Sequence, residues 1–256
     1  MTETYPISQL YVEQHGDGPR VLFVHGGEEA GGATAFAPQI PLAKHFTLVW
    51  PDLPGHGKSP AQGHKNADRD AGIISELLGD GAHLVGHSYG GAVALRVAAL
   101  YPERIHSITL IEPATFDIAA YDPVVFELLM KIVAASQIPD LRLRLETFAT
   151  AVGIHKVWTD PLSDTYRRFA EDLPTLQTPA PDAISSRQYA EKIVAAGVPA
   201  LVISGGHLAA FEILCDVMAQ ALHGERTVVP GYSHTPQQNA AVFNARLDEF
   251  WSGHAV

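Results

Sequence analysis

Residues 85–91 read Val-Gly-His-Ser-Tyr-Gly-Gly and contain the pattern G-x-S-x-G. They stand between a short apolar run at 82–85 and a helical pattern at 90–101. A serine on a sharp strand-to-helix turn exposes its hydroxyl, and flanking glycines let neighbouring backbone pass without a Cβ clash. The N–H groups at the start of the following helix attract developing negative charge. The pattern therefore predicts that Ser88 is a nucleophile; the other interpretation is a serine that only caps the helix.

Five further apolar or β-branched runs accompany the one before Ser88, and a helix-length segment separates each run from the next. This arrangement is typical of parallel strands that are buried on both faces. We therefore predict an α/β fold with a mostly parallel, doubly wound sheet and helices on both faces. Residues 7–10 and 11–14 have the pattern of an antiparallel edge hairpin. The predicted parallel strands are residues 21–24, 46–50, 82–85, 105–111, 200–203 and 226–229.

The alternation of strands and helices stops after Glu112. Four helical patterns follow without a buried-strand run between them, and prolines separate them. We expect residues 113–196 to form a helical cap over one end of the sheet, with residues 1–112 and 197–256 forming the core. The four predicted helices are residues 123–137, 140–150, 163–171 and 185–196.

Composition restricts the classes of partner. The chain has 256 residues and a formal net charge of −11, so its surface repels nucleic acid and anionic membranes. No apolar run approaches the roughly 20 residues that span a bilayer, and the first residues lack the apolar stretch of a signal peptide. The single cysteine, Cys215, excludes an internal disulfide and is typical of a reducing compartment. We expect a cytoplasmic protein that binds a small molecule; the sequence does not indicate its oligomeric state.

The loop after the first core strand reads His25-Gly26-Gly27-Glu28-Glu29. An acyl-transfer site holds its oxyanion with backbone N–H groups, one from the residue after the nucleophile and one from such a loop. We therefore predict that Tyr89 and Gly27 donate these two hydrogen bonds. The charges of Glu28 and Glu29 would oppose an oxyanion unless both side chains point to solvent.

Four motifs occur in a fixed order: His-Gly-Gly at 25–27, D-x-x-G-x-G-x-S at 52–59, the serine motif at 86–91, and Gly-Tyr-Ser-His at 231–234. Together they resemble the α/β-hydrolase superfamily, in its capped branch with a serine nucleophile. The resemblance covers nearly the whole chain outside the helical insert. It implies that residues 52–59 form a structural turn, although Gly57-Lys58-Ser59 imitates the end of a phosphate-binding loop.

The resemblance also implies which histidine accepts the proton of Ser88. His234 follows the last strand run and precedes an amphipathic helical pattern at 241–251, where the family places its catalytic base. His87 adjoins the serine, but its side chain should point elsewhere. The histidines show no spacing typical of a metal site, so we predict no metal and no cofactor.

The acid is harder to identify. The family usually carries it on the loop after strand 200–203, but that loop reads Ser-Gly-Gly-His at 204–207 and has no carboxylate before Glu212. Glu112 ends the preceding strand, where a charge is costly unless it has a partner, and His234 would be that partner. We predict Glu112 as the acid. A serine–histidine dyad and three other carboxylates remain open as alternatives: Asp52, Asp117 and Glu212.

These residues predict a serine hydrolase that cleaves carboxylic esters through an acyl-enzyme. The many apolar residues of the insert suggest an apolar pocket for small to medium uncharged substrates. Hydrolysis of lactones, thioesters or the C–C bond of diketones, and perhydrolysis, use the same groups and remain alternatives. A non-catalytic ligand-binding protein of the same fold is the alternative from a different class.

Overall fold

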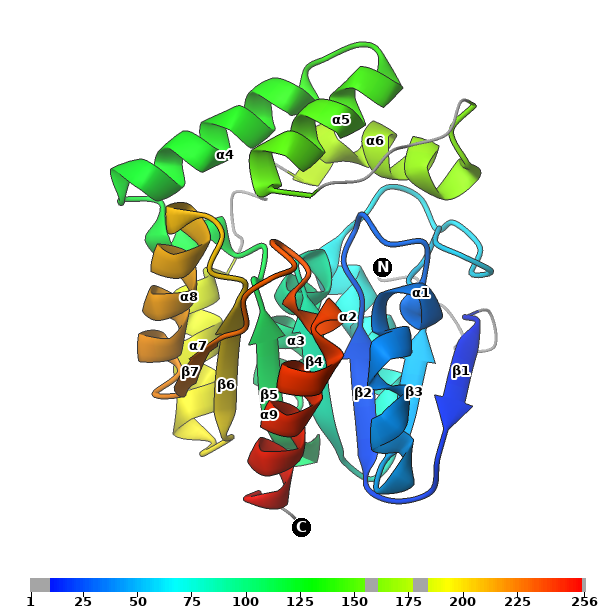
Figure 1. The fold of residues 1–256 in the computed structure, drawn as a ribbon, viewed down its shortest axis with the longest axis vertical. Helices are drawn as coiled ribbons and strands as arrows, with labels where there is room; N and C mark the ends of the chain where they lie inside the picture. The colour runs from blue at the N-terminus through cyan, green and yellow to red at the C-terminus, as the bar shows by residue number, and fades with distance from the viewer. Residues whose placement is uncertain (1–9, 155–160, 177–183, 255–256) are drawn as a thin grey trace.

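A computed structural model describes residues 10–154, 161–176 and 184–254. In these residues seven strands form one sheet in the order β1-β3-β2-β4-β5-β6-β7 (Figure 1). All neighbouring strands are parallel except β1 and β3. The predicted α/β fold with a mostly parallel sheet is confirmed. The strands are β1 (Val12–His15), β2 (Arg20–Val24), β3 (Thr47–Pro51), β4 (Ala82–His87), β5 (Ile105–Ile111), β6 (Ala200–Ser204) and β7 (Glu225–Val228).

The central strands are apolar throughout because helices cover both faces of the sheet. Leu22 and Val24 of β2 enter one apolar cluster, whereas Val21 and Phe23 enter the other. This alternation follows from the two-residue period of a strand. Every second residue must therefore be apolar on each face, which gives the continuous runs seen in the sequence.

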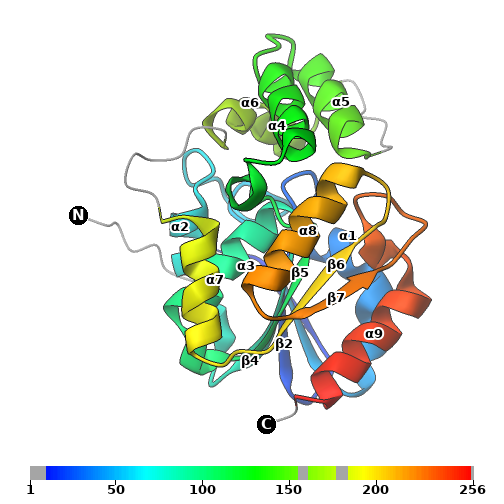
Figure 2. The same ribbon diagram turned by 90° about the vertical axis from the view of Figure 1, so that its left-hand side faces the viewer.

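The helices divide between the two faces (Figure 2). One face carries α1 (Gly32–Phe36) and α9 (Ala240–Ser252), and Trp251 of α9 packs edge-on against Phe23. The other face carries the remaining core helices, which lie side by side in chain order, so that each helix contacts the next one along the chain. These are α2 (Ala67–Ser75), α3 (Tyr89–Leu100), α7 (Ser186–Ala195) and α8 (Ala209–Ala221).

Three helices lie beyond the carboxyl ends of the strands (Figure 1): α4 (Pro123–Ser136), α5 (Leu141–Val152) and α6 (Asp164–Leu176). Asp140 caps α5 by accepting a hydrogen bond from the Leu143 N–H, and Gly153 ends that helix in the left-handed conformation. The fourth predicted helix, α7, packs instead against α3 and α8. We propose that the cap consists of α4–α6 and ends before α7, rather than at residue 196.

The antiparallel edge strand β1 pairs with β3, with Val12 opposite Pro51. The expected hairpin between residues 7–10 and 11–14 stays a prediction, because residues 7–9 lie outside the described part of the chain. The pairing covers hydrogen-bonding groups that β3 would otherwise expose at the edge of the sheet. Among the described residues, no helix combines the length and apolar character that crossing a membrane requires.

Candidate active site

Ser88 stands on the turn between β4 and α3 and has φ of 51°, a left-handed conformation that is uncommon for a residue with a side chain. The turn needs glycine on both sides of Ser88. A Cβ at Gly90 would lie 2.2 Å from the Val24 carbonyl oxygen, and a Cβ at Gly86 would lie 2.5 Å from the Gly90 carbonyl oxygen. The two glycines therefore let α3 start close against the sheet, with Ser88 at its N-terminus.

Strand register brings Ser88 and Glu112 to the same edge. His87 of β4 is paired with Ile111 of β5, and the next residue of each strand is Ser88 or Glu112. The Ser88 N–H donates to the Ile111 carbonyl oxygen at 2.9 Å. Glu112 also has a positive φ, 39°, so both chains turn sharply where the strands end.

His234 lies between the serine and the carboxylate. Its Nε2 is 3.1 Å from Ser88 Oγ, and its Nδ1 is 2.6 Å from Glu112 Oε2. All three side chains are buried. The structure therefore brings the predicted nucleophile, base and acid into one hydrogen-bonded chain. A carboxylate on Nδ1 leaves Nε2 free to accept the hydroxyl proton.

Glu112 is held in its ionised form. Burial raises its pKa, but the close contact with His207 and the hydrogen bond from His234 outweigh burial and lower the pKa to about 2. The Gly205 N–H donates a further hydrogen bond to Oε1 at 2.6 Å. His207 was not among the predicted site residues, although it occupies the loop after strand 200–203, where the acid was first sought.

The three alternative carboxylates have other partners. Asp52 accepts hydrogen bonds from the backbone N–H groups of Gly32 and Lys58. Asp117 binds Ser186, and Glu212 pairs with Arg226 at 2.7 Å. Within the part of the chain that the structure describes, these carboxylates make no hydrogen bond with His234.

The two predicted oxyanion donors follow neighbouring strands. Tyr89 is the first residue of α3, so its N–H has no partner within the helix. Its phenol donates to Asp70 Oδ2 at 2.7 Å, which anchors the residue. Gly27 follows β2, and the ring of Phe169 from α6 covers it: a Cβ at Gly27 would lie 2.5 Å from Phe169 Cε2. Helix α6 thus packs directly on this loop.

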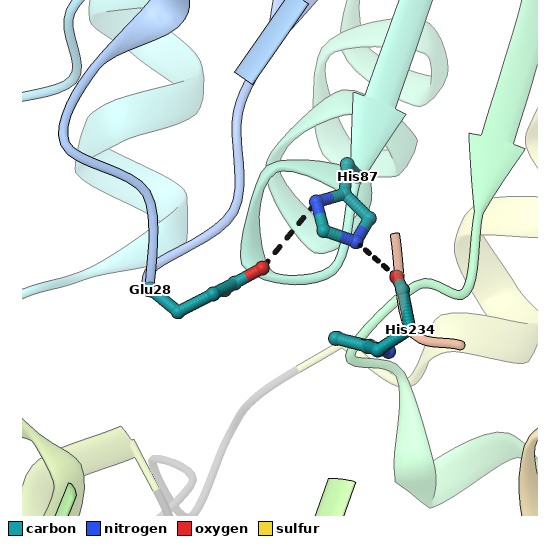
Figure 3. A group of neighbouring side chains, drawn as sticks. All are labelled: Glu28, His87 and His234. Carbon is teal, nitrogen blue, oxygen red and sulfur yellow. Dashed lines mark hydrogen bonds and ion pairs between the residues drawn. The ribbon is translucent and has the colours of Figure 1, made fainter. Parts of the chain in front are cut away.

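Glu28 and Glu29 do not point to solvent; both are buried, with 3% and 8% of their surface exposed, so a negative charge on either would oppose an oxyanion held by the Gly27 N–H. Figure 3 shows the His87 ring between the Glu28 carboxylate and the backbone of His234. His87 Nδ1 is 3.4 Å from Glu28 Oε1, and His87 Nε2 is 2.8 Å from the His234 carbonyl oxygen. Burial lowers the pKa of His87 to about 4. The neutral ring donates to that carbonyl and supports the loop that carries His234.

A cavity of about 220 Å³ lies between the loop at 54–65 and α6. Phe169 lines it, but so do the charged side chains of Lys65, Arg168 and Asp172. The Lys65 side chain is buried, and its ammonium lies 4.7 Å from the centroid of the Tyr89 ring. This cavity is therefore not apolar throughout. Ser88, His234 and Glu112 are not among its lining residues, so the apolar substrate pocket stays a prediction.

Among the residues that the structure describes, two groups of ligand-type side chains are close enough to be compared with metal sites. One contains Glu28 and His87, the other Glu112 and His207, and both depend on His234. The two ring nitrogens of His234 already contact Glu112 and Ser88. A metal ion there would break the hydrogen-bonded chain, so the absence of a metal site stays our prediction.

Known proteins resemble this chain in sequence and in fold. Residues 19–241 match the family model described as alpha/beta hydrolase fold. The chain is 34% identical over 152 residues to a 2-hydroxy-6-oxo-6-phenylhexa-2,4-dienoate hydrolase of Burkholderia cepacia, covering 55% of this chain and 53% of that protein. It is 39% identical over 118 residues to lipase LipV of Mycobacterium tuberculosis, covering 42% and 43%. The chain thus aligns with about half or less of the length of these curated relatives.

Solved structures agree along nearly the whole chain. A structure of the N-acyl homoserine lactonase AidH superimposes with a TM-score of 0.69 at 20% identity, covering 96% of this chain and 93% of that one. The enol-lactonase of Burkholderia xenovorans gives a TM-score of 0.64 at 22% identity, covering 95% and 96%. At such identities the likeness concerns the fold alone. With the family match over residues 19–241, the chain belongs to the alpha/beta hydrolase fold family.

Proposed function

We propose that this protein is a serine hydrolase that cleaves carboxylic esters through an acyl-enzyme. The observation that carries the proposal is the chain of contacts from Ser88 Oγ through His234 to Glu112, with distances of 3.1 Å and 2.6 Å. Isolated serine hydroxyls are weak nucleophiles, and this arrangement supplies a base and a group that orients the base. A non-catalytic binding protein would have no need of the complete chain of contacts.

Each group has a defined task in the proposed reaction. Ser88 attacks the carbonyl carbon while His234 Nε2 takes the hydroxyl proton, and the Gly27 and Tyr89 N–H groups stabilise the resulting oxyanion. Glu112, ionised because its pKa is about 2, stabilises the imidazolium that forms. His234 then protonates the leaving alcohol. In the second half it activates water, which releases the acid and restores Ser88.

Esters of small to medium acyl groups are the proposed substrates. Relatives with 38% identity over 103 and 102 residues are named pimeloyl-[acyl-carrier protein] methyl ester esterases, which supports an ester over other carbonyl compounds. The Phe169 ring on Gly27 restricts the space near the proposed oxyanion site. Lactones and the C–C bond of diketones remain second candidates, because relatives and structural neighbours carry those names.

Hydrolysis of a p-nitrophenyl ester series, from acetate to decanoate, tests the proposal. We expect turnover by the wild type, a loss of about 10³-fold or more in Ser88→Ala, and a similar loss in Glu112→Gln. Ser252→Ala, at the exposed end of α9, is the matched control and should keep full activity. Full activity in Ser88→Ala would disprove the nucleophile. Turnover of lactones or diketones without turnover of esters would favour the second candidates.

A further inference from the structure

His207 connects Glu112 to the end of a cap helix. Its Nδ1 lies 3.3 Å from Glu112 Oε1, and its Nε2 lies 3.1 Å from the carbonyl oxygen of Val152, the last residue of α5. The next residue, Gly153, makes this approach possible, because a Cβ there would lie 2.5 Å from His207 Cδ2. Only 11% of the His207 side chain is exposed. One imidazole therefore joins the carboxylate of the proposed triad to α5.

Both partners of the His207 ring can only accept hydrogen bonds. A neutral imidazole has a single N–H, so it can donate to the carboxylate or to the carbonyl, but not to both. The imidazolium has two N–H groups and can donate to both at once. In the structure Nε2 makes the hydrogen bond to the carbonyl, whereas Nδ1 makes no hydrogen bond and faces Glu112 Oε1 at the ion-pair distance of 3.3 Å. An imidazolium presents a proton to the carboxylate at this contact, whereas a neutral ring that donates from Nε2 would present a lone pair to it.

The surroundings of His207 favour the positive charge. Burial lowers the pKa of His207, but the contact with the Glu112 carboxylate, the Val152 carbonyl and the charge of Glu212 on α8 together raise it above its usual value. The C-terminal end of α5 adds the negative end of a helix dipole. Arg226, which is paired with Glu212, and His234 are the positively charged or titratable groups on the opposing side.

The distance between His207 and His234 is fixed by Phe211. The Phe211 ring stacks on His207 with a centroid distance of 5.6 Å and lies 4.7 Å from the His234 ring. The centroids of the two imidazoles are 6.3 Å apart. A charge on His207 therefore acts on His234 at short range, in an interior where screening by water is weak.

We propose that His207 is a positioning residue of the site: as an imidazolium it holds the Glu112 carboxylate and the end of α5 together, and its charge opposes a second proton on His234. The inference rests on the proposed serine–histidine–glutamate triad. It explains how the acid can sit at the end of β5 while the loop that usually carries it provides a histidine instead.

The protonation state of the His207 ring directly tests the claim that His207 is an imidazolium. Long-range ¹H–¹⁵N spectra of the full-length protein with ¹⁵N-labelled histidine report both ring nitrogens of the chain's 13 histidines, and His207→Gln assigns the His207 signals. We expect both nitrogens of His207 to carry protons at pH 7. A neutral tautomer at pH 7 would overturn the inference, whatever the enzyme hydrolyses.

The pH profile of kcat/KM tests the claim that the charge of His207 acts on His234. In His207→Gln the positive charge is gone, so we expect the acid limb to move upward by about 0.5–2 units, from a charge at this distance in a medium between water and protein. The exposed His45→Gln is the matched control and should leave the limb in place. A loss of rate in His207→Gln without movement of the limb would mean a purely structural histidine and would refute the proposal. Failure of the proposed triad would be seen separately, as full activity in Ser88→Ala.

Discussion

Lys65 is a cation in an unfavourable place. Its side chain is buried, and its ammonium makes no hydrogen bond within the described residues. Burial lowers its pKa to about 8, in spite of attraction by Asp70 and Asp172. In the unfolded chain the pKa of this lysine has its usual value near 10.5. Between pH 8 and 10.5 the protein therefore takes up a proton when it unfolds, so the folded state becomes more stable as the pH rises through that range.

We therefore expect Lys65→Met to stabilise the protein at pH 7, by about 1–3 kcal/mol, and to have little effect above pH 10.5. The methionine keeps most of the side-chain volume and removes the buried charge. Urea unfolding at pH 7 and pH 10.5 measures the difference. The exposed Lys44→Met should change neither value. Destabilisation by Lys65→Met at pH 7 would show that the charge makes a net favourable contribution.

Individual residues differ in how far the sequence predicts them. Ser88 and His234 stand in motifs, and Glu112 could be selected because a charge at the end of an apolar strand needs a partner. The direction of Glu28 could not be predicted, because its burial depends on the approach of His87 from another strand. The sequence contains one indication of His207: the loop at 204–207 has a histidine and no carboxylate.

At the scale of elements, the contact between α3 and β2 depends on one glycine. A Cβ at Gly90 would lie 2.2 Å from the Val24 carbonyl oxygen, so α3 would have to move away from the sheet and take Ser88 with it. We expect Gly90→Ala to destabilise the protein by about 2–4 kcal/mol, because the clash outweighs the helix propensity gained. Thermal unfolding and ester hydrolysis should both show the loss.

Gly72 provides the matched control for Gly90. It lies within α2, and a Cβ there would meet nothing within 4 Å. Gly72→Ala should therefore stabilise the protein by about 0.5–1 kcal/mol, since alanine favours the helix and restricts the unfolded chain. If both substitutions changed the free energy of unfolding equally, the close packing at Gly90 would not be the cause.

The element boundaries show what sequence patterns predict well. The predicted strand at 105–111 has the bounds of β5, and the predicted helix at 123–137 differs from α4 by one residue. The predicted helix at 163–171 is too short, because α6 continues through Pro174 to Leu176. Proline normally ends a helix; here Leu173, which is buried, continues the packed face. Tertiary contacts of this kind are not visible in local sequence.

For the whole molecule, buried histidines determine the response to acid. Burial lowers the pKa of His25 to about 3 and those of His83 and His87 to about 4, and it lowers the pKa of His56 well below its usual value. Each has the usual value of 6.5 in the unfolded chain. Between pH 6.5 and 4 the unfolded state therefore binds more protons than the folded state, and stability falls as the pH falls. His207 acts in the opposite direction, because its pKa is raised: its contribution is present below pH 6.5 and is lost as pH rises through its folded value.

Four protons taken up by these histidines on unfolding correspond to a slope of about 5 kcal/mol per pH unit near pH 5. We expect urea unfolding between pH 6.5 and 4.5 to show this slope. His83 is the residue to substitute, because it bonds Ser107 and stacks on Trp251 near the start of β4, away from Ser88. His83→Gln should lower the slope by about one proton, whereas the exposed His45→Gln should leave it unchanged. A slope that did not respond to His83→Gln would mean that carboxylates, and not buried neutral histidines, cause the acid sensitivity.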